Sequence, residues 1–458
     1  MKELDQYRRL LKHLPDPVKE AEVNGERLDI LMAGITDGKP AAKKWSDVTS
    51  LFVRASGEKT GFTYTENLEE DSEAVLMRAY DNGLSGENRE EMLKLEDTQN
   101  VWREPELTDH LPVETLEEMA ANLEKKIRAV SPLMVHIEAE VSETIRTLSV
   151  VNSFGVDRTT VRKWLSAEVT VTAGEQEEWN RYFFCSWKRP EDIKPGELLY
   201  KRAADWLAKQ QVKPAESFQS GSKRAVLGAD VMTNILATAW QALDAVHYDN
   251  GSTPWKGELG NQILSPEVSI TDYPVHGANG YQFPMDCEGI IGRQTSVVKK
   301  GRLLNLLHTA ATANHSSVNP TGNAGRKNLL SGNLHTNVIP IPRNFVMEPG
   351  KWNQEELLKQ LGDGVYIDES FDVFHSINIA SGEFHIPCRG ILVENGALAG
   401  RIGGITIDGN LQDLLQQVEA VGEDLTFRTM DILKSYCVAA PSVLVKQLNI
   451  SGTEGEQS

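Results

Sequence analysis

The sequence is poor in cysteine and in long apolar runs. Only four cysteines occur in 458 residues, and their irregular spacing does not match a disulfide framework, so we expect reduced thiols. No stretch approaches the roughly 18 to 20 apolar residues of a membrane-spanning helix, and no apolar run follows Met1 as it would in a secretion signal. We therefore expect a soluble, cytoplasmic protein.

Positive charge is also scarce. The chain has 47 lysines and arginines against 66 aspartates and glutamates, for a formal net charge of −19. Nucleic-acid phosphates would be repelled, which argues against a nucleic-acid partner. Phosphate-binding glycine motifs are missing too, since the P-loop spacing is absent around Gly57-Glu58-Lys59-Thr60 and no G-x-G-x-x-G opens a helix. Nucleotide binding is therefore unsupported.

The first 215 or so residues alternate helical and strand-like patterns. Apolar spacing predicts helices over residues 4–14, 71–81 and 116–130 and strands over 135–142, 145–152 and 162–173. Residues 49–54 and 62–65 are expected to form a hairpin across the turn-forming Ser56-Gly57-Glu58. Together these patterns predict a sheet covered by helices.

A polar stretch rich in turn formers, residues 213–224, marks a domain boundary. Beyond it the chain becomes richer in glycine and strand patterns, with helices expected near 230–247, 303–313, 353–361 and 410–421. The length is sufficient for two cores. We therefore predict an α+β fold with an N-terminal sheet-and-helix domain over 1–215 and a β-rich domain over 216–458 that contains a buried helix.

That buried helix is the segment 230–247. Apolar residues recur at three- and four-residue steps and occupy most of its circumference: Val231, Ile235, Leu236, Ala239, Trp240, Ala242, Leu243 and Val246. Asp230 suits the first turn, and Asp249-Asn250-Gly251 is a turn signal that ends it.

A glycine-punctuated series of motifs follows this helix. It comprises Gly260-Asn261-Gln262-Ile263, Ser269-Ile270-Thr271-Asp272, Phe283-Pro284-Met285-Asp286-Cys287-Glu288-Gly289, Lys300-Gly301-Arg302-Leu303, Glu348-Pro349-Gly350, Ser381-Gly382-Glu383-Phe384, Ile407-Asp408-Gly409-Asn410-Leu411 and Ala440-Pro441-Ser442. This order resembles the TldD/TldE (PmbA) family, also called modulator of DNA gyrase, over most of residues 226 to 452. The first half of the chain is less similar.

The resemblance implies a role for the buried helix. In the TldD half of the family it carries His-Glu-x-x-x-His, which binds zinc and supplies a general base. The matching positions here fall near Leu236, Ala237 and Gln241, none of which is a useful zinc ligand. Cys437 lies in the region of TldD's late cysteine ligand, but its surroundings differ. The chain is thus similar to TldE, and we predict no catalytic, cofactor-binding or metal-binding residue in it.

Two other motifs could carry chemistry. His385 and Cys388 look like half a zinc site, but residues three apart in a strand point to opposite faces. Cys287 lies between Asp286 and Glu288, whose carboxylates would disfavour the thiolate, so structural packing is the better interpretation.

Further candidates are weaker. His308 and His315 would share a helix face only if a helix continued through both, and the sequence around residues 314–320 is typical of a loop. Trp240 and Trp255 could line a peptide channel, although core packing is the commoner role of such aromatic residues.

Three functional hypotheses follow. In the first, the chain is a zinc-free subunit that pairs with a TldD-type, zinc-bearing subunit in a peptidase acting on unfolded or ribosomally made peptides. In the second, it is a stand-alone homodimer that binds peptides without catalysis. In the third, it is an independent enzyme that uses Cys287, Cys388 or Cys437 with a histidine.

Overall fold

The computed structural model describes residues 2–41, 43–85, 92, 102–103, 109–174, 179–189, 195–277, 281–326, 338–429 and 436–452. With 23% helix and 45% strand, the chain has the mixed α and β content that its sequence predicts. No helix among these residues is long and apolar enough to cross a membrane. No described sheet joins strands from the two predicted domains.

Contacts divide the chain into two compact units. Unit 1 comprises Met1–Ala203, Pro274–Arg293 and His308–Ile341, and unit 2 comprises Ala204–Tyr273, Gln294–Leu307 and Pro342–Ser458. Two segments of the second half therefore pack with the first half. A single boundary at residue 215 does not account for these two segments. Apolar contact accounts for part of this arrangement, since Met285 is buried against Leu148 and Val150 of the first half.

Unit 1 is built on a sheet of eight described strands. Its order is β4 (Thr60–Thr65), β3 (Lys44–Ser56), β1 (Glu20–Thr36), β6 (Met134–Asn152), β7 (Asp157–Ala173) and β5 (Trp102–Arg103), while β2 (Lys39–Pro40) pairs with β1 and β8 (Trp179–Trp187) pairs with β7. Leu51 pairs with Thr65, which confirms the predicted hairpin. The strands expected over 135–142 and 145–152 form the single strand β6.

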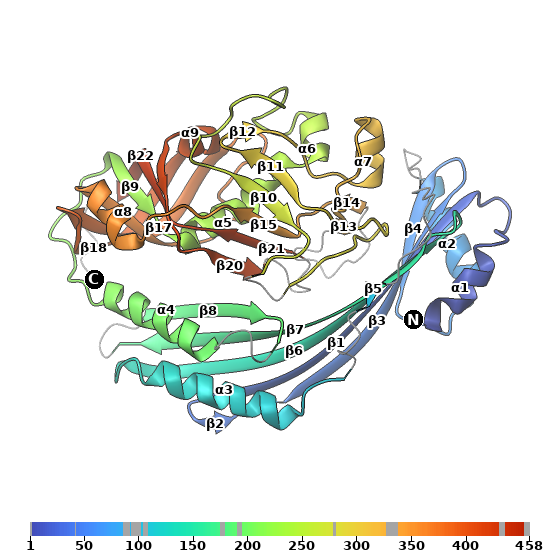
Figure 1. The fold of residues 1–458 in the computed structure, drawn as a ribbon, viewed down its shortest axis with the longest axis horizontal. Helices are drawn as coiled ribbons and strands as arrows, with labels where there is room; N and C mark the ends of the chain where they lie inside the picture. Colours follow the sequence, from blue (N-terminus) through green and yellow to red (C-terminus); the bar gives the residue numbers. More distant parts are fainter. Residues whose placement is uncertain are drawn as a thin grey trace. The chain divides into compact units, whose positions relative to one another are not determined.

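Helices cover parts of this sheet. Among the described residues, unit 1 contains the short η1 (Lys2–Leu4), α1 (Asp5–Leu10), α2 (Ser72–Leu84), α3 (Val113–Arg128) and α7 (Ala310–His315), while α4 (Pro195–Gln210) begins in unit 1 and ends in unit 2. Helix α3 lies along β1 and β6 (Figure 1) and buries Leu116, Leu123 and Ile127 there. Helix α2 approaches β4 closely, because a Cβ on Gly61 would lie 2.1 Å from the Ala79 carbonyl oxygen. Strands β13 (Ala324–Arg326) and β14 (Val338–Pro340) form a small separate sheet.

The described residues of unit 2 form two six-stranded sheets. One has the order β12 (Arg302–Leu303), β11 (Thr295–Lys299), β10 (Ile270–Tyr273), β15 (Asn344–Met347), β21 (Cys437–Ala440) and β20 (Thr426–Thr429). The other has the order β18 (Ala397–Asn410), β17 (Glu383–Glu394), β16 (Gly364–Ser370), β9 (Gly221–Leu227), β22 (Val443–Gly452) and β19 (Val418–Val421). Because β18 also pairs with β22, the second sheet closes on itself.

The helices of unit 2 are α5 (Ala229–Ala239), η2 (Trp240–Leu243), α6 (Ala245–Asn250), α8 (Gln354–Leu361) and α9 (Leu411–Gln416) within the described residues. Helix α5 contacts β16 of one sheet and β20 and β21 of the other, so it lies between the two sheets (Figure 1). The prediction of a helix buried in a β-rich domain is thus confirmed. Helix α8 matches the expected 353–361.

Four helix predictions were wrong in extent. The helix expected over residues 4–14 ends at Leu10. The segment 230–247 is broken at Asp244, whose extended backbone ends η2 and whose carboxylate caps α6. Helix α7 begins at Ala310, because a capping box between Thr309 and Thr312 starts it there, so 303–313 is not one helix. Helix α9 ends at Gln416 and the chain continues as β19. The turn predicted at Asp249-Asn250-Gly251 is confirmed, because Gly251 adopts a left-handed conformation (φ 71°) after α6.

Candidate functional site

The helix that resembles the zinc helix has a packed apolar surface. At the three positions matching the family's zinc motif, Leu236 is 2% exposed, Ala237 is 1% exposed and Gln241 is 7% exposed. The Gln241 side-chain amide donates a hydrogen bond to the Thr238 carbonyl oxygen at 3.2 Å. These three side chains fill the interior of unit 2, and none of them offers an imidazole, carboxylate or thiolate to a metal.

Hydrogen bonds fix this helix to one sheet. The Thr233 hydroxyl donates to the Thr426 carbonyl oxygen at 3.1 Å, and the Ala440 backbone N–H donates to the same hydroxyl at 3.1 Å. The Trp240 ring packs edge-on against the Tyr436 ring, with 5.7 Å between centroids. Strand β21, which begins at the buried Cys437, therefore lies beside the helix.

The break in the helix creates a histidine–carboxylate pair that sequence reasoning missed. Asp244 is buried, and its two oxygens accept the His247 backbone N–H and contact the His247 Nδ1, each at 2.8 Å. The Asp-x-x-His spacing of an N-cap was the available signal. The pair orients one imidazole, but among the described residues no group of three or more His, Cys, Asp or Glu side chains is placed to hold a metal.

Strand geometry separates His385 from Cys388, the two residues considered as half a zinc site. The His385 side chain is 77% exposed and its Nδ1 lies 2.6 Å from the Asp408 Oδ1, whereas Cys388 is buried on the opposite face of β17. Burial raises the pKa of the Cys388 thiol to about 12. The two side chains therefore cannot act on one ion.

Cys287 is an equally poor nucleophile. The pKa of its thiol is raised to about 12, chiefly by burial; Arg326 lowers it, while the neighbouring Asp286 and Glu288 contribute to the rise. Cys437 is fully buried. A protonated thiol is weakly nucleophilic, so these environments give no support to the third hypothesis.

The remaining candidate residues either pack in the core or lie apart from one another. His308 precedes α7 and places its Nδ1 3.2 Å from the Thr312 hydroxyl, while His315 is the exposed last residue of that helix. They share no helix face, because the helix starts after His308. Trp240 and Trp255 are each 1% exposed and belong to the core.

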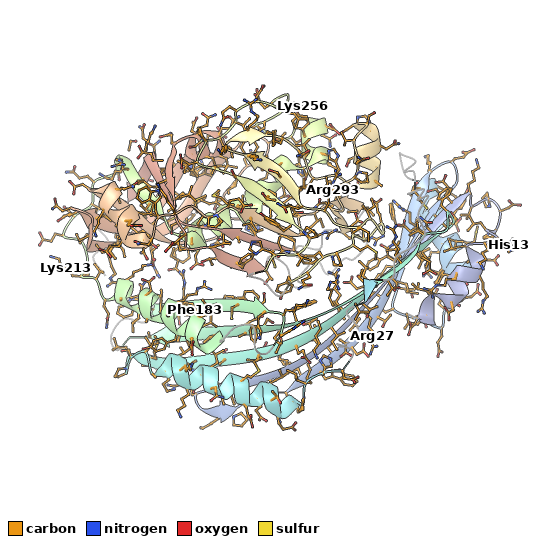
Figure 2. All side chains as sticks on the ribbon, in the orientation of Figure 1. His13, Arg27, Phe183, Lys213, Lys256 and Arg293 are labelled. Carbon is orange, nitrogen blue, oxygen red and sulfur yellow. The ribbon has the colours of Figure 1, made fainter. Side chains whose placement is uncertain are left out.

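Unit 1 contains a buried ion cluster that the sequence analysis did not identify. Arg54 on β3 contacts the carboxylates of Glu22 and Glu288 at 3.1 and 3.4 Å, and all three side chains are at most 1% exposed. Arg27, labelled in Figure 2, forms a contrasting pair at the surface. It is exposed and donates two hydrogen bonds to Asp47, each 2.7 Å long. The sequence signal was Glu288 itself, which we weighed only as a neighbour of Cys287.

Several curated metalloproteases are similar to this chain in sequence. Relatives include the metalloprotease PmbA of Escherichia coli O157:H7, which is 27% identical over 42% of this chain and 38% of its own, and the metalloprotease TldD homolog of Buchnera aphidicola subsp. Schizaphis graminum, which is 24% identical over 88% and 86%. The chain spans only about two fifths of the length of the first curated relatives it matches, for example 41% of an Archaeoglobus fulgidus metalloprotease.

Solved structures extend the similarity to the whole fold. A Thermotoga maritima protein described as a modulator of a DNA gyrase superposes with a TM-score of 0.81 and 25% identity, covering 98% of this chain and 99% of its own. TldE from Thermococcus kodakarensis superposes with a TM-score of 0.80 and 17% identity, covering 99% and 100%, and so shows a common fold. Residues 220–452 match the PmbA/TldA metallopeptidase C-terminal domain, which is more than half of the sequence. The chain therefore belongs to the PmbA/TldD metalloprotease family.

Proposed function

We propose that this chain is a TldE-like subunit, without zinc of its own, of a cytoplasmic TldD/TldE-type metallopeptidase that processes or degrades unfolded or ribosomally made peptides. The observation that carries the proposal is the chemistry at the positions of the zinc motif. Leu236 and Ala237 are apolar and buried, and Gln241 is engaged with its own helix. Zinc is expected in a TldD-type partner.

Peptide hydrolysis explains why a partner is needed. Cleaving an amide requires an activated water and a polarised carbonyl, and a zinc ion with a nearby glutamate supplies both. The buried apolar surface of α5 supplies neither, and the three cysteines considered as nucleophiles are buried or held as thiols. The role left to this chain is positioning, in which it holds the peptide in place for the partner's metal.

An open strand edge supports such a role. Strand β4 pairs only with Leu51–Ser56 of β3, and no other described strand pairs with Lys44–Ser50 on that side. This edge is mostly exposed, and Trp45 on it is 67% exposed. An extended peptide can add to such an edge through backbone hydrogen bonds, which tolerate many side chains.

The test is a peptidase assay on an unfolded peptide with this chain alone, with a TldD-type partner alone and with the mixture, each with and without a chelator. We expect cleavage to be greatest in the mixture and to be abolished by the chelator. Chelator-sensitive cleavage by this chain alone would refute the proposal. Peptide binding by this chain without any effect on the partner would favour the stand-alone homodimer instead.

A further inference from the structure

The open edge of the unit 1 sheet carries one exposed apolar side chain on each of its faces. This edge is Lys44–Ser50 of β3, and no other described strand pairs with its outer side. Trp45 is 67% exposed and Val48 is 41% exposed. Because side chains alternate along a strand, these two residues, three positions apart, point to opposite faces of the sheet. The other residues of the edge are lysine, serine, aspartate and threonine, so these two supply all of its apolar surface.

Trp45 is exposed but held in position. Its indole N–H donates a hydrogen bond to the Asp29 Oδ1 at 2.8 Å. Trp45 pairs with Leu31 in the β1–β3 ladder and Asp29 pairs with Asp47, so the two partners are diagonal neighbours on one face. The hydrogen bond restricts the ring while most of its surface stays open to solvent.

A buried network fixes the Asp29 carboxylate in turn. The His110 Nε2 lies 2.8 Å from the same Asp29 oxygen, and its Nδ1 lies 2.9 Å from the Glu143 Oε2. The Leu111 backbone N–H donates to that Glu143 oxygen at 2.7 Å, and the Lys163 Nζ lies 3.0 Å from the other. The Glu143 side chain is fully buried. The exposed indole is therefore preorganised, which reduces the entropy lost when a ligand orders it.

Strand geometry specifies which side chains a ligand would place against this edge. A residue directly opposite another in a paired strand points to the same face, with its Cβ about 4.5 to 5.5 Å away. A strand that adds to the edge therefore places one side chain beside Trp45. Three positions along, it places another beside Val48. This spacing is the same for a parallel and an antiparallel strand.

The size of the edge suits a short peptide better than a second folded chain. Residues 44–50 form an edge roughly 24 Å long and about 10 Å deep. A stable dimer buries about 800 Å² on each partner, well above what this edge offers. An extended peptide needs only the unpaired backbone groups and the two apolar contacts.

We propose that the Lys44–Ser50 edge selects extended peptide segments that carry two apolar residues three positions apart, with Trp45 and Val48 as the side chains that recognise them. The inference rests on the proposed function, in which this chain holds peptides for a partner's metal, and it names the class of peptide that is held. Residues between the two apolar positions face polar side chains and are free to vary.

Two capped, unstructured peptides of the same composition test this selectivity with the full chain. Each has two leucines among serines and threonines, three positions apart in one peptide and two apart in the other. We expect the first to bind about fivefold more tightly, measured by the fluorescence anisotropy of a terminal dye. Trp45→Ser should remove this preference. Val135→Ser, at a 49% exposed apolar residue on β6, is the matched control and should leave it unchanged.

Fluorine NMR of the chain labelled with 5-fluorotryptophan locates the bound peptide. The Trp45 signal is the one missing from Trp45→Phe, and it should shift when the first peptide is added. Asp29→Ala should narrow this signal in the free chain, because the indole loses the hydrogen bond that restricts it.

Equal affinities for the two peptides, with an unmoved Trp45 signal, would overturn the inference while leaving the proposed function in place. A Trp45 signal that shifts with protein concentration, or on adding a TldD-type partner without peptide, would also overturn it, because the edge would then be a subunit interface. Failure of the mixture to cleave any peptide would count against the proposed function alone, provided that the spacing preference is observed.

Discussion

The helix α5 of unit 2 and the ion cluster of unit 1 are both largely buried, but their side chains differ in chemistry. In α5, nine of eleven residues are buried, and the positions that match the zinc motif carry Leu236, Ala237 and, on the following turn, Gln241. In unit 1, Glu22, Arg54 and Glu288 are buried as charged or titratable groups. The buried cluster of unit 1 is therefore ionisable, whereas the buried positions of the helical segment that match the zinc motif are not.

A charge placed on α5 should have the largest effect of any substitution discussed here. Leu236→Glu puts a carboxylate at a position between two sheets that is 2% exposed, and we expect a loss of more than about 4 kcal/mol in the free energy of unfolding. Leu236→Met, of similar volume, should cost less than about 1.5 kcal/mol. Urea unfolding measures both. A well-tolerated Leu236→Glu would mean that this surface is accessible to water and that the packing argument is wrong.

Removing the cation of the unit 1 cluster should have the next largest effect. Arg54→Met leaves Glu22 and Glu288 without their shared partner, and we expect a cost of about 3 kcal/mol in unfolding free energy. Arg27→Met, at the exposed pair with Asp47, is the matched control and should cost less than about 1 kcal/mol. Equal costs for the two variants would contradict the distinction between buried and surface charges.

The break in the helical segment predicts a smaller effect. Asp244→Ala removes the side chain that accepts the His247 N–H at the start of α6, and we expect a loss of about 1 to 2 kcal/mol. Asp244→Asn keeps a capping oxygen and should recover most of that loss. If alanine and asparagine were equally destabilising, the cap would not be the reason for the break.

A surface histidine should produce the smallest effect. Hydrogen bonds to Asp37 and then Glu138 raise the pKa of His136 above its ordinary 6.5, so its contribution is fully present below that value and is lost as the pH rises through the folded-state pKa. Because His136 is exposed, we expect about 0.5 kcal/mol or less. Comparing His136→Gln with the native chain at pH 5.5 and 8.5 measures it. A larger difference at the higher pH would have the wrong sign.

Local patterns predicted the elements that depend on neighbours in sequence. The 49–65 hairpin, α2, α3 and α8 follow from apolar spacing and turn residues, and the structure contains each of them. The resemblance in the second half also identified the family and a buried helix. These successes share one cause, since each signal is contained in a short stretch of chain.

Long-range contacts could not be predicted in this way. Glu22 and Arg54 lie more than 200 residues before Glu288, and no spacing rule connects them. Apolar periodicity likewise gives no sign that residues 274–293 and 308–341 pack with the first half of the chain. The predicted helix limits near Asp244 and Ala310 were wrong for a different reason. At both places, capping side chains override the apolar spacing.

Native mass spectrometry of the chain purified under mild conditions from its own cells tests the central claim most directly. We predict a complex containing this chain and a second chain that carries His-Glu-x-x-x-His, with zinc that stays with the second chain when the two are separated. A metal-free homodimer that shows no such partner would contradict the account. So would about one tightly bound zinc ion retained by this chain alone.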